Sequence, residues 1–498
     1  MQSGSRPSAQ RRRDPRGDTD LVVASNFIRA VRDSGYVSMS TALAELVDNS
    51  LQASATSIAI TIGRPDSGDL PEINVVDNGL GMSRAELETC LRFGGTGRFD
   101  SRESFGRFGM GLPAASLSQS RRIEVTAWQA GRTPQTVRLD VDDVVNGVPA
   151  GLRPRRSGMQ TTSPNGCIVS WQRCDRVEYQ RLAWLERALH RDLGRVFRRF
   201  LDAGVSISIN GTRVKSRDPL LLRRTVDGHS AALAFEPTRY ELATAAGGTS
   251  FVEVRFSLLP VAAWHRLDNA TKRRTDIVGG GGVSIMRAGR EIAFGWHLMG
   301  GKRKENYDDW WRCEIEFEPD LDEHFGLTIN KQGIRPSSQL REALEPQLES
   351  AARSLNARVR QEFEDIKFRA ATAVSCRIAE ATDPHLPVIT HARRRKSGNG
   401  GLSYRLTSTA LPSETMLSTR LDDGILEVTL NVDHPAYAAL YGPLQSLADG
   451  SAENPLRTAI ELLILSFARS HLSSGGHADQ TDLLAIWSDT YARMLQRI

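Results

Sequence analysis

The most informative segment of the sequence is Glu45-Leu46-Val47-Asp48-Asn49-Ser50. It lies in a run with apolar residues at helical spacing, which predicts a helix from about Ser40 to Gln52. On this helix Glu45 and Asn49 are four residues apart and share one face, opposite the apolar face. A carboxylate there can take a proton from water, and an amide oxygen can bind Mg²⁺ without adding negative charge. Taken alone, the segment fits a plain solvated helix face better than it fits a catalytic and metal-binding site.

A second polar segment is Asp77-Asn78-Gly79-Leu80-Gly81-Met82, which follows the short apolar run Ile73–Val76 directly. That run predicts a strand, so Asp77 stands at a strand end. A carboxylate in this position can accept a hydrogen bond from an adenine amino group. Glycines just beyond it let the backbone approach a flat base. The alternative is an ordinary turn, because Asp-Asn-Gly is turn chemistry in any protein.

Glycines dominate the next two segments, Gly94–Arg98 and Gly106–Pro113. So many glycines within about twenty residues predict a mobile lid, over residues 96–105. Pro113 suits the first turn of a helix, so Gly109 to Leu112 would present free N–H groups at the start of that helix. A helix N-terminus with small residues can hold a phosphate group. A fourth segment, Asn165–Trp171, shows by itself only that a strand begins there.

The remaining pattern divides the chain into six parts. Strand signals in the first α/β part come in adjacent groups instead of alternating with helices, which predicts a mixed sheet with helices on one face. A second part has strand signals near 252–258, 283–286 and 313–317, and the last part has one at 425–432 with helical patterns near 454–472 and 480–497. The expected parts are a disordered basic arm (1–20), the first α/β part (21–215), the second (216–345), a helical segment (346–383), a basic linker (384–401) and a C-terminal α+β region (402–498).

Composition restricts the possible environments and partners. The net charge is +5, and basic clusters occur at Arg11–Arg13, Lys272–Arg274, Lys302–Lys304 and Arg393–Lys396. Each fits a solvated loop, but together they indicate a polyanion partner. No apolar run approaches the roughly 20 residues of a membrane helix, and the polar start is no secretory signal, so a cytoplasmic protein without a membrane partner is expected. The five cysteines form no C-x-x-C pair, which argues against a zinc finger.

In their order and spacing, these segments resemble the GHKL ATPase superfamily of gyrase B, ninety-kilodalton heat-shock chaperones, sensor histidine kinases, MutL and MORC proteins. Glu45–Asn49 is similar to the N box, Asp77–Gly81 to the first glycine box and Gly106–Gly111 to the second. The lead-in from Gly35 to Asn49 is particularly similar to the MORC and MutL branch. The resemblance implies a Bergerat-type ATP-binding domain, an α+β sandwich. It also implies a following transducer (S5-like) α/β domain, before a mainly helical C-terminal region, with ATP and Mg²⁺ as cofactors.

The resemblance also implies a role for individual residues. Glu45 would activate the attacking water, Asn49 would bind Mg²⁺, and Asp77 would hold the adenine. Lys331, in the loop Asn330-Lys331-Gln332, would reach the γ-phosphate, although a solvated loop lysine is the competing interpretation. Arg287–Arg290 resembles an earlier hairpin of the transducer. The other residues expected at the nucleotide are Gly79, Gly81, Met82, Thr96, Gly106, Gly109, Met110, Gly111, Leu112 and Cys167, the last replacing the family's usual threonine.

The function implied by the resemblance is ATP hydrolysis coupled to a homodimeric clamp that closes on DNA without sequence preference. The alternative is a chaperone-like or signalling switch that acts on a protein partner, with the C-terminal region as a candidate contact. A sensor kinase is disfavoured because no histidine precedes the boxes, His190 being the first. Chromosome maintenance and defence against phage both suit such a protein, and no residue decides between them.

Overall fold

The computed structural model of the protein describes the greater part of the chain. Three residues expected at the site, Thr96, Gly106 and Lys331, lie outside the described part. The same holds for the expected N-terminal arm, the expected lid and most of the expected linker. The described residues are 23–36, 38–66, 70–95, 109–148, 151–179, 181–245, 247–327, 333–387, 389, 401–412, 415–446, 454–473, 490 and 493–494.

The chain divides into two compact units. The first consists of Met1–Pro260 and Leu267–Arg353, and the second of Val261–Arg266 and Ser354–Ile498. The first expected α/β part therefore lies in the first unit, and so does the second apart from residues 261–266. The division at Arg353 falls within one long helix, α11 (Ser338–Ala371). This helix begins before Pro346, where the sequence pattern placed the start of a separate helical segment.

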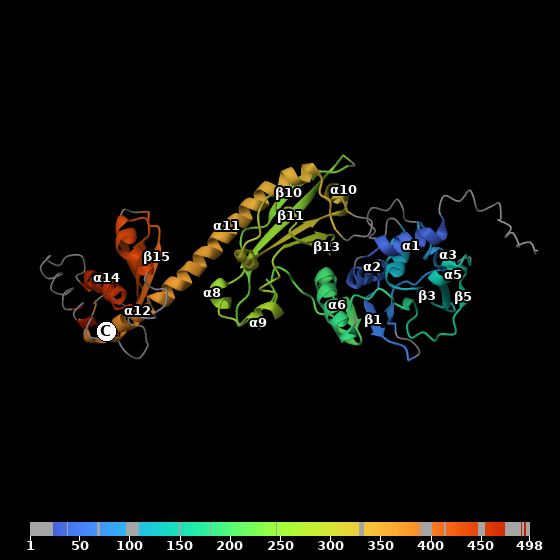
Figure 1. Ribbon diagram of the computed structural model, residues 1–498, viewed down its shortest axis with the longest axis horizontal. Coiled ribbons are helices and arrows are strands. Elements are labelled where there is room, and N and C mark those ends of the chain that lie inside the picture. The colour runs from blue at the N-terminus through green and yellow to red at the C-terminus, as the bar shows by residue number, and fades with distance from the viewer. Residues whose placement is uncertain are drawn as a thin grey trace, which may run out of the picture. The chain divides into compact units, whose positions relative to one another are not determined.

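An eight-stranded sheet forms the first part of unit 1, in the order β5-β4-β3-β6-β2-β1-β7-β8. Figure 1 labels three of its strands, β1, β3 and β5. Neighbouring strands are antiparallel except for the parallel pair β1 and β7. The mixed sheet expected from the grouping of the strand signals is therefore confirmed. The strands are β1 (Ser57–Gly63), β2 (Glu72–Asp77), β3 (Arg122–Trp128), β4 (Gln135–Asp140), β5 (Arg155–Arg156), β6 (Gly166–Gln172), β7 (Ser206–Ile209) and β8 (Thr212–Arg213).

Helices cover one face of this sheet because alternate strand residues are apolar and point toward them. In β2, for example, Ile73 and Val75 are buried, whereas Asn74 between them is only half-buried. Leu43 and Leu46 of the helix α2 belong to the same core. The helices of this part are α1 (Ala24–Ser34), α2 (Met39–Gln52), α3 (Arg84–Thr89), α4 (Gly111–Gln119), α5 (Val141–Val145), α6 (Leu182–Val196) and α7 (Arg198–Asp202).

The second sheet of unit 1 has the order β10-β11-β14-β12-β13, with β9 paired to β11. Only β12 and β14 run parallel. Leu340, Leu344 and Leu348 of α11 are buried at four-residue spacing, so this helix presents one apolar stripe. The elements are β9 (Ala232–Leu233), β10 (Thr238–Ala243), β11 (Thr249–Leu258), α9 (Asn269–Arg274), β12 (Val283–Arg287), β13 (Arg290–Gly295), the 3₁₀ helices Asn306–Trp310 and Pro319–Leu321, β14 (Trp311–Phe317) and α10 (Asp322–Phe325).

The tight turn between β12 and β13 consists of Ala288 and Gly289, both with positive φ, 46° and 81°. Such a two-residue turn fits the twist of a hairpin. It sets Arg290 at the start of β13, where its Nε donates to Oδ1 of Asp48 at 3.0 Å. Both side chains are buried. This ion pair thus joins the hairpin of the second sheet to α2 at Asp48, three residues after Glu45.

A larger buried ion-pair network joins α7 to the second sheet. Arg198 pairs with Glu314 of β14 at 2.5 Å and with Glu291 of β13 at 3.1 Å. Its guanidinium also donates to Ser284 at 2.8 Å. Burial opposes the charge of Glu314, yet the neighbouring arginines lower the pKa of its carboxyl below the ordinary value. Ion pairs therefore help to hold the junction between the two sheets. Removing one partner of such a pair would leave a buried charge unpaired, at a cost of several kcal/mol.

Unit 2 contains a three-stranded sheet in the order β15-β17-β16, in which β15 and β17 are parallel. The sequence pattern found only the β17 strand and the helix near 454–472, and the second expected helix, near 480–497, lies almost wholly outside the described residues. Buried Leu426 and Val428 of β17 share a core with Leu462 and Leu465 of α14. The elements are α8 (Val261–Trp264), α12 (Ala373–Thr382), the 3₁₀ helix Asp383–His385, β15 (Ser403–Thr409), β16 (Leu417–Asp422), β17 (Ile425–Asn431), the π-helix Tyr437–Tyr441, α13 (Gly442–Ser446) and α14 (Pro455–Ser473).

One expected DNA-facing cluster is not what its sequence indicated. The side chain of Lys302 is only 2% exposed, and its Nζ lies 2.7 Å from Oδ1 of the fully buried Asp308. Lys302 is therefore a structural ion-pair partner, and the expectation that it faces a duplex is wrong. Lys304 and Arg303 are exposed. Within the described ranges, no helix has the length and apolar character needed to cross a membrane.

Candidate functional site

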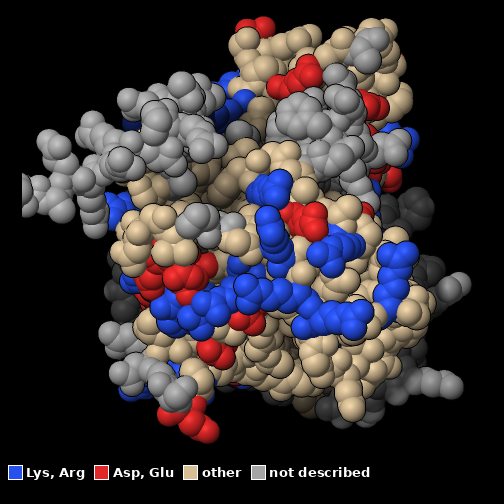
Figure 2. Space-filling model, turned by 90° about the vertical axis from the view of Figure 1, so that its right-hand side faces the viewer, with Lys and Arg blue, Asp and Glu red and all other residues tan. Residues whose placement is uncertain are grey.

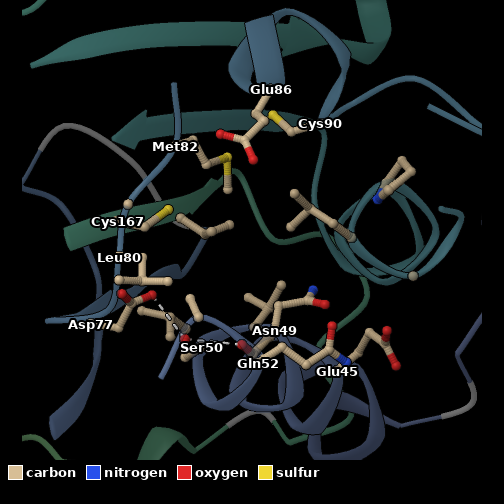
Figure 3. Close-up of a pocket in the computed structure, with 18 of the residues that line it drawn as sticks. Glu45, Asn49, Ser50, Gln52, Asp77, Leu80, Met82, Glu86, Cys90 and Cys167 are labelled. Carbon is tan, nitrogen blue, oxygen red and sulfur yellow. Dashed lines mark hydrogen bonds between the residues drawn. The ribbon is translucent and has the colours of Figure 1, made fainter. Parts of the chain in front are cut away.

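A cavity of about 600 Å³ lies between α2, α3, the start of α4 and the strands β2 and β6. Figure 3 shows it with Asp77 and Glu45 toward opposite ends and Asn49 between them. Four segments far apart in the sequence therefore contribute to one site. Of the expected residues, the structure places Glu45, Asn49, Asp77, Gly81, Met82, Gly109, Gly111, Leu112 and Cys167 on its wall.

Two further expected residues stand behind the wall. The N–H of Gly79 donates to Oδ1 of Asp77 at 2.9 Å and so helps to fix that carboxylate. Met110 precedes α4, and its carbonyl oxygen accepts the N–H of Ala114 at 3.0 Å. Neither residue lines the cavity, but Gly79 supports a lining residue and Met110 stands at the start of the lining helix α4.

The end of the cavity at Asp77 is built by the contact between α2 and the turn after β2. The N–H of Leu80 donates to the carbonyl oxygen of Ala53, just past the end of α2, at 2.8 Å. Ser50 of α2 donates from Oγ to Oδ2 of Asp77 at 2.9 Å. Burial raises the pKa of the Asp77 carboxyl above its ordinary value, although the hydrogen bonds from Gly79 and Ser50 oppose this. A carboxylate has about four acceptor positions, so Asp77 keeps the capacity to accept a hydrogen bond from a ligand.

Close backbone approach explains the glycine at position 81. Gly81 has φ +67°, and a Cβ there would lie 2.0 Å from the carbonyl oxygen of Trp128. The turn therefore tolerates no side chain at this point, because both the dihedral angle and the space exclude it. The next residue, Met82, can then line the cavity as a flexible apolar wall.

At the opposite end, Glu45 meets the N-terminus of α4. A Cβ on Gly111 would lie 2.0 Å from Oε1 of Glu45, so a side chain there would have to displace the Glu45 carboxylate. Glu45 is almost fully buried. Burial raises the pKa of the Tyr36 hydroxyl above its ordinary value, and the charges of Glu45 and Asp48 raise it further. The first N–H groups of α4 lack partners within the helix, which favours an anion beside them. Pro113 stands in the first turn of α4, as expected.

Several lining residues were not predicted from the sequence. Ser50 follows Asn49 directly in the sequence, but only the fold shows its hydrogen bond to Asp77. Glu86, Thr89 and Cys90 come from α3 and the residue after it, a helix with no recognised motif. Burial raises the pKa of the Cys90 thiol to about 12, so it is a neutral wall residue.

Cys167 lies opposite Asp77 in the β2–β6 ladder and lines the cavity. Burial raises the pKa of its thiol well above the ordinary value, with the charge of Asp77 as a second cause. The thiol is therefore neutral, and it provides a small apolar surface with weak hydrogen-bonding capacity.

The donor set for a metal is sparse. Among the residues with described positions, no group of three His, Cys, Asp or Glu side chains could hold a metal ion. Mg²⁺ differs from zinc in this respect, because it keeps several waters and usually takes one or two protein oxygens together with substrate phosphates. The amide oxygen of Asn49, beside Glu45 on the cavity wall, fits this kind of site.

The cavity therefore offers a fixed carboxylate acceptor at one end and an anion-favouring helix start with a second carboxylate at the other. That arrangement suits a ligand with a hydrogen-bond-donating ring at one end and phosphates at the other. Residues 37–154 match the family model described as "Histidine kinase-, DNA gyrase B-, and HSP90-like ATPase". This match spans Glu45, Asn49, Asp77 and α4, and it supports an ATP-binding GHKL domain with the mixed α/β fold that the sequence predicted.

A second comparison gives a particular relative. The chain is 37% identical over 98 residues to the "DNA mismatch repair protein MutL" of Colwellia psychrerythraea. The matched residues are 17% of this chain and only 15% of that protein's length. The similarity supports the GHKL assignment, while closeness to MORC proteins stays a prediction.

Proposed function

We propose that the protein hydrolyses ATP and that ATP closes it into a homodimeric clamp on DNA, as in MORC and MutL proteins. The observation that carries the proposal is the single cavity that brings Glu45, Asn49 and Asp77 to the start of α4. The similarity to a mismatch repair protein supports the DNA part. The exposed arginines and lysines of unit 1 agree with it.

In this proposal the chemical roles follow the order of groups along the cavity. Asp77, held by Ser50 and Gly79, accepts a hydrogen bond from the adenine amino group. The N-terminus of α4 receives the phosphates, and Asn49 holds Mg²⁺, which would neutralise phosphate charge. Glu45 takes a proton from the attacking water. Lys331, which lies outside the described residues, is proposed to contact the γ-phosphate.

The link to a clamp comes from the second sheet. Arg290 of the β12–β13 hairpin binds Asp48, which lies between Glu45 and Asn49 on α2. A change in the position of α2 on ATP binding is thereby transmitted to the hairpin. A ligand shifts a conformational equilibrium only through contacts that differ between the two states, and the γ-phosphate supplies such contacts only in ATP.

Asp77→Ala is expected to weaken the binding of ATP and ADP equally, by about 10- to 100-fold. A hydrogen bond to a charged group contributes about 1.5–3 kcal/mol, and both nucleotides carry the same base. Calorimetric titration measures both affinities. Because protonation removes the acceptor and burial raises the pKa of Asp77, the affinity of the parent protein should also fall as the pH is lowered.

The matched control for this change is Asn78→Ala. Asn78 stabilises the same turn by accepting the N–H groups of Thr56 and Ser57 at 2.9 Å, but it is exposed and does not line the cavity. Its affinity for nucleotide should stay close to that of the parent protein. Normal binding by Asp77→Ala, or an equal loss in both variants, would remove the adenine role from Asp77.

The clamp is tested by sedimentation velocity of the Glu45→Gln variant, which should retain ATP without turning it over. With ATP the sedimentation coefficient should rise to that of a dimer, and with ADP it should stay that of the nucleotide-free protein. Identical profiles with the two nucleotides would contradict the clamp and leave a constitutive ATPase. A dimer with ATP but no DNA binding would favour a switch acting on a protein partner.

A further inference from the structure

A second hollow of unit 1, of about 690 Å³, lies away from the nucleotide cavity. It is lined by α6, β8, the segment from Lys215 to Arg224, and α9, and it shares no lining residue with the nucleotide cavity. Seven arginines and Lys215 line it, against three aspartates. These cations are scattered over almost ninety residues of sequence, so most of them belong to none of the basic clusters that the sequence displays.

The aspartates hold part of this charge in place without cancelling it. Asp276 pairs with Arg217 and lies 3.9 Å from Arg224, and Asp202 pairs with Arg223. Asp218 accepts the backbone N–H groups of Leu220 and Leu222, at 2.9 and 3.0 Å. Its charge therefore fixes the local backbone. The hollow keeps a clear excess of positive charge, and its paired arginines are already ordered.

Four of the cations form no ion pair with any carboxylate of the described residues. Arg187 and Arg274 donate instead to the carbonyl oxygen of Ala183 and to Oγ1 of Thr271. The other two donate no side-chain hydrogen bond within that part of the chain. These are Arg213, at the end of β8, and Lys215, and both side chains are exposed. An Arg guanidinium presents a planar set of donors that matches a phosphate group, and a Lys ammonium binds phosphate as a point charge. Both are therefore available to an external anion.

The chemistry of the lining distinguishes the kind of partner. All of the lining residues are polar or charged: arginine, lysine, aspartate, histidine, serine or threonine. A protein partner needs apolar or aromatic anchors at the centre of its interface. Contacts with the sugar–phosphate backbone of DNA, in contrast, are made by Arg, Lys, Ser and Thr and bury little apolar surface.

We propose that this hollow holds the phosphodiester backbone of duplex DNA, with Arg213 and Lys215 as direct phosphate contacts. The proposal rests on the DNA part of the function proposed above, and it assigns that partner to a surface. Contacts of this kind contain no base readout, so binding is independent of sequence and sensitive to salt.

A second basic surface of the same sheet supplies the matched control. Figure 2 shows a band of Lys and Arg side chains, with Asp and Glu beside it, on the side where Figure 1 labels α5 and β5. The strand β5 consists of Arg155 and Arg156, both exposed, and it forms the opposite edge of the eight-stranded sheet from β8. Removing these two charges changes the net charge as much as removing Arg213 and Lys215 does.

The test measures the affinity of the full-length protein for a duplex of arbitrary sequence by fluorescence anisotropy, between about 50 and about 200 mM salt. The double variant R213Q/K215Q should reduce the slope of log K against log salt by about 2, one unit for each lost phosphate contact. The charge-preserving variant R213K/K215R should keep the parent slope. R155Q/R156Q should keep it as well, and all variants should hydrolyse ATP at the parent rate without DNA.

The possible outcomes distinguish failure of the hollow as the DNA-binding surface from failure of the proposed DNA clamp function. If the parent protein binds DNA and R213Q/K215Q has the same slope as R155Q/R156Q, the hollow is not the DNA surface, while the clamp function stands. If the parent protein binds no DNA at the lowest salt concentration, the hollow and the DNA part of the function both fail. Equal binding of poly-glutamate, with the same loss in R213Q/K215Q, would overturn the phosphodiester assignment in favour of an acidic protein.

Discussion

Glu45→Gln is expected to lower the rate of ATP hydrolysis by about 10²–10⁴-fold, which is the usual contribution of a general base. ATP affinity should stay nearly unchanged, because glutamine keeps the shape of the side chain that packs against Gly111. The variant loses only the ability to take a proton from water. Single-turnover kinetics would measure hydrolysis, and calorimetric titration would measure affinity.

Glu88→Gln is the control for this change. Glu88 lies on α3 beside the cavity, but its exposed side chain pairs with Arg84 and does not line the cavity. Removing that charge should leave the hydrolysis rate at the parent value. The assignment of Glu45 as the base fails if Glu45→Gln hydrolyses ATP normally, or if it loses ATP binding altogether.

Arg290→Ala is expected to lower the free energy of unfolding of unit 1 by about 3–5 kcal/mol, because it leaves the carboxylate of Asp48 buried without its ion-pair partner. Asp48 is 1% exposed and Arg290 is 5% exposed, so water cannot replace the lost contact in the native geometry. Hydrolysis should fall too, since Asp48 lies on α2 between Glu45 and Asn49. Urea unfolding and steady-state hydrolysis measure the two effects.

The hairpin itself provides the control. Arg287 stands on the other side of the Ala288-Gly289 turn and pairs with Asp322, within the second sheet's own region. Arg287→Ala should destabilise that region without slowing hydrolysis. The double variant Asp48→Leu/Arg290→Met should recover much of the stability, because no buried charge is then left alone. Equal hydrolysis in Arg290→Ala and Arg287→Ala would contradict a coupling role for Arg290.

The residues of the site that could be predicted from the sequence are those that lie close together within one short segment. Glu45 and Asn49 share a helix face by spacing alone, and Asp77 follows a recognisable strand. Contacts between distant segments carry no such signal. Nothing near Asp48 in the sequence indicates a partner 242 residues away, and the arginines of the basic hollow lie on four separate segments.

Charge runs were the least reliable signal. The run Lys302–Lys304 indicates an exposed loop, either solvated or facing DNA, yet Lys302 is buried against Asp308, with Nζ 5.8 Å from the ring centre of Trp296 and 6.0 Å from that of Trp311. Neighbours in sequence here differ completely in burial, because Lys302 turns inward while Arg303 and Lys304 stay exposed. Only packing decides which residue of such a run turns inward.

The ion pairs between α7 and the second sheet also restrict how the two layers can slide. Glu314 and Glu316 stand two residues apart on β14, so their carboxylates repeat every ~7 Å along the strand. Arg199 reaches both, at 3.1 and 2.8 Å, and Arg255 lies 3.2 and 3.6 Å from the same two. A shift of α7 along β14 would break the pairs of Arg198 with Glu291 and Glu314 and leave buried charges unpaired. The junction therefore favours one register of α7 on the second sheet over a continuous range of positions.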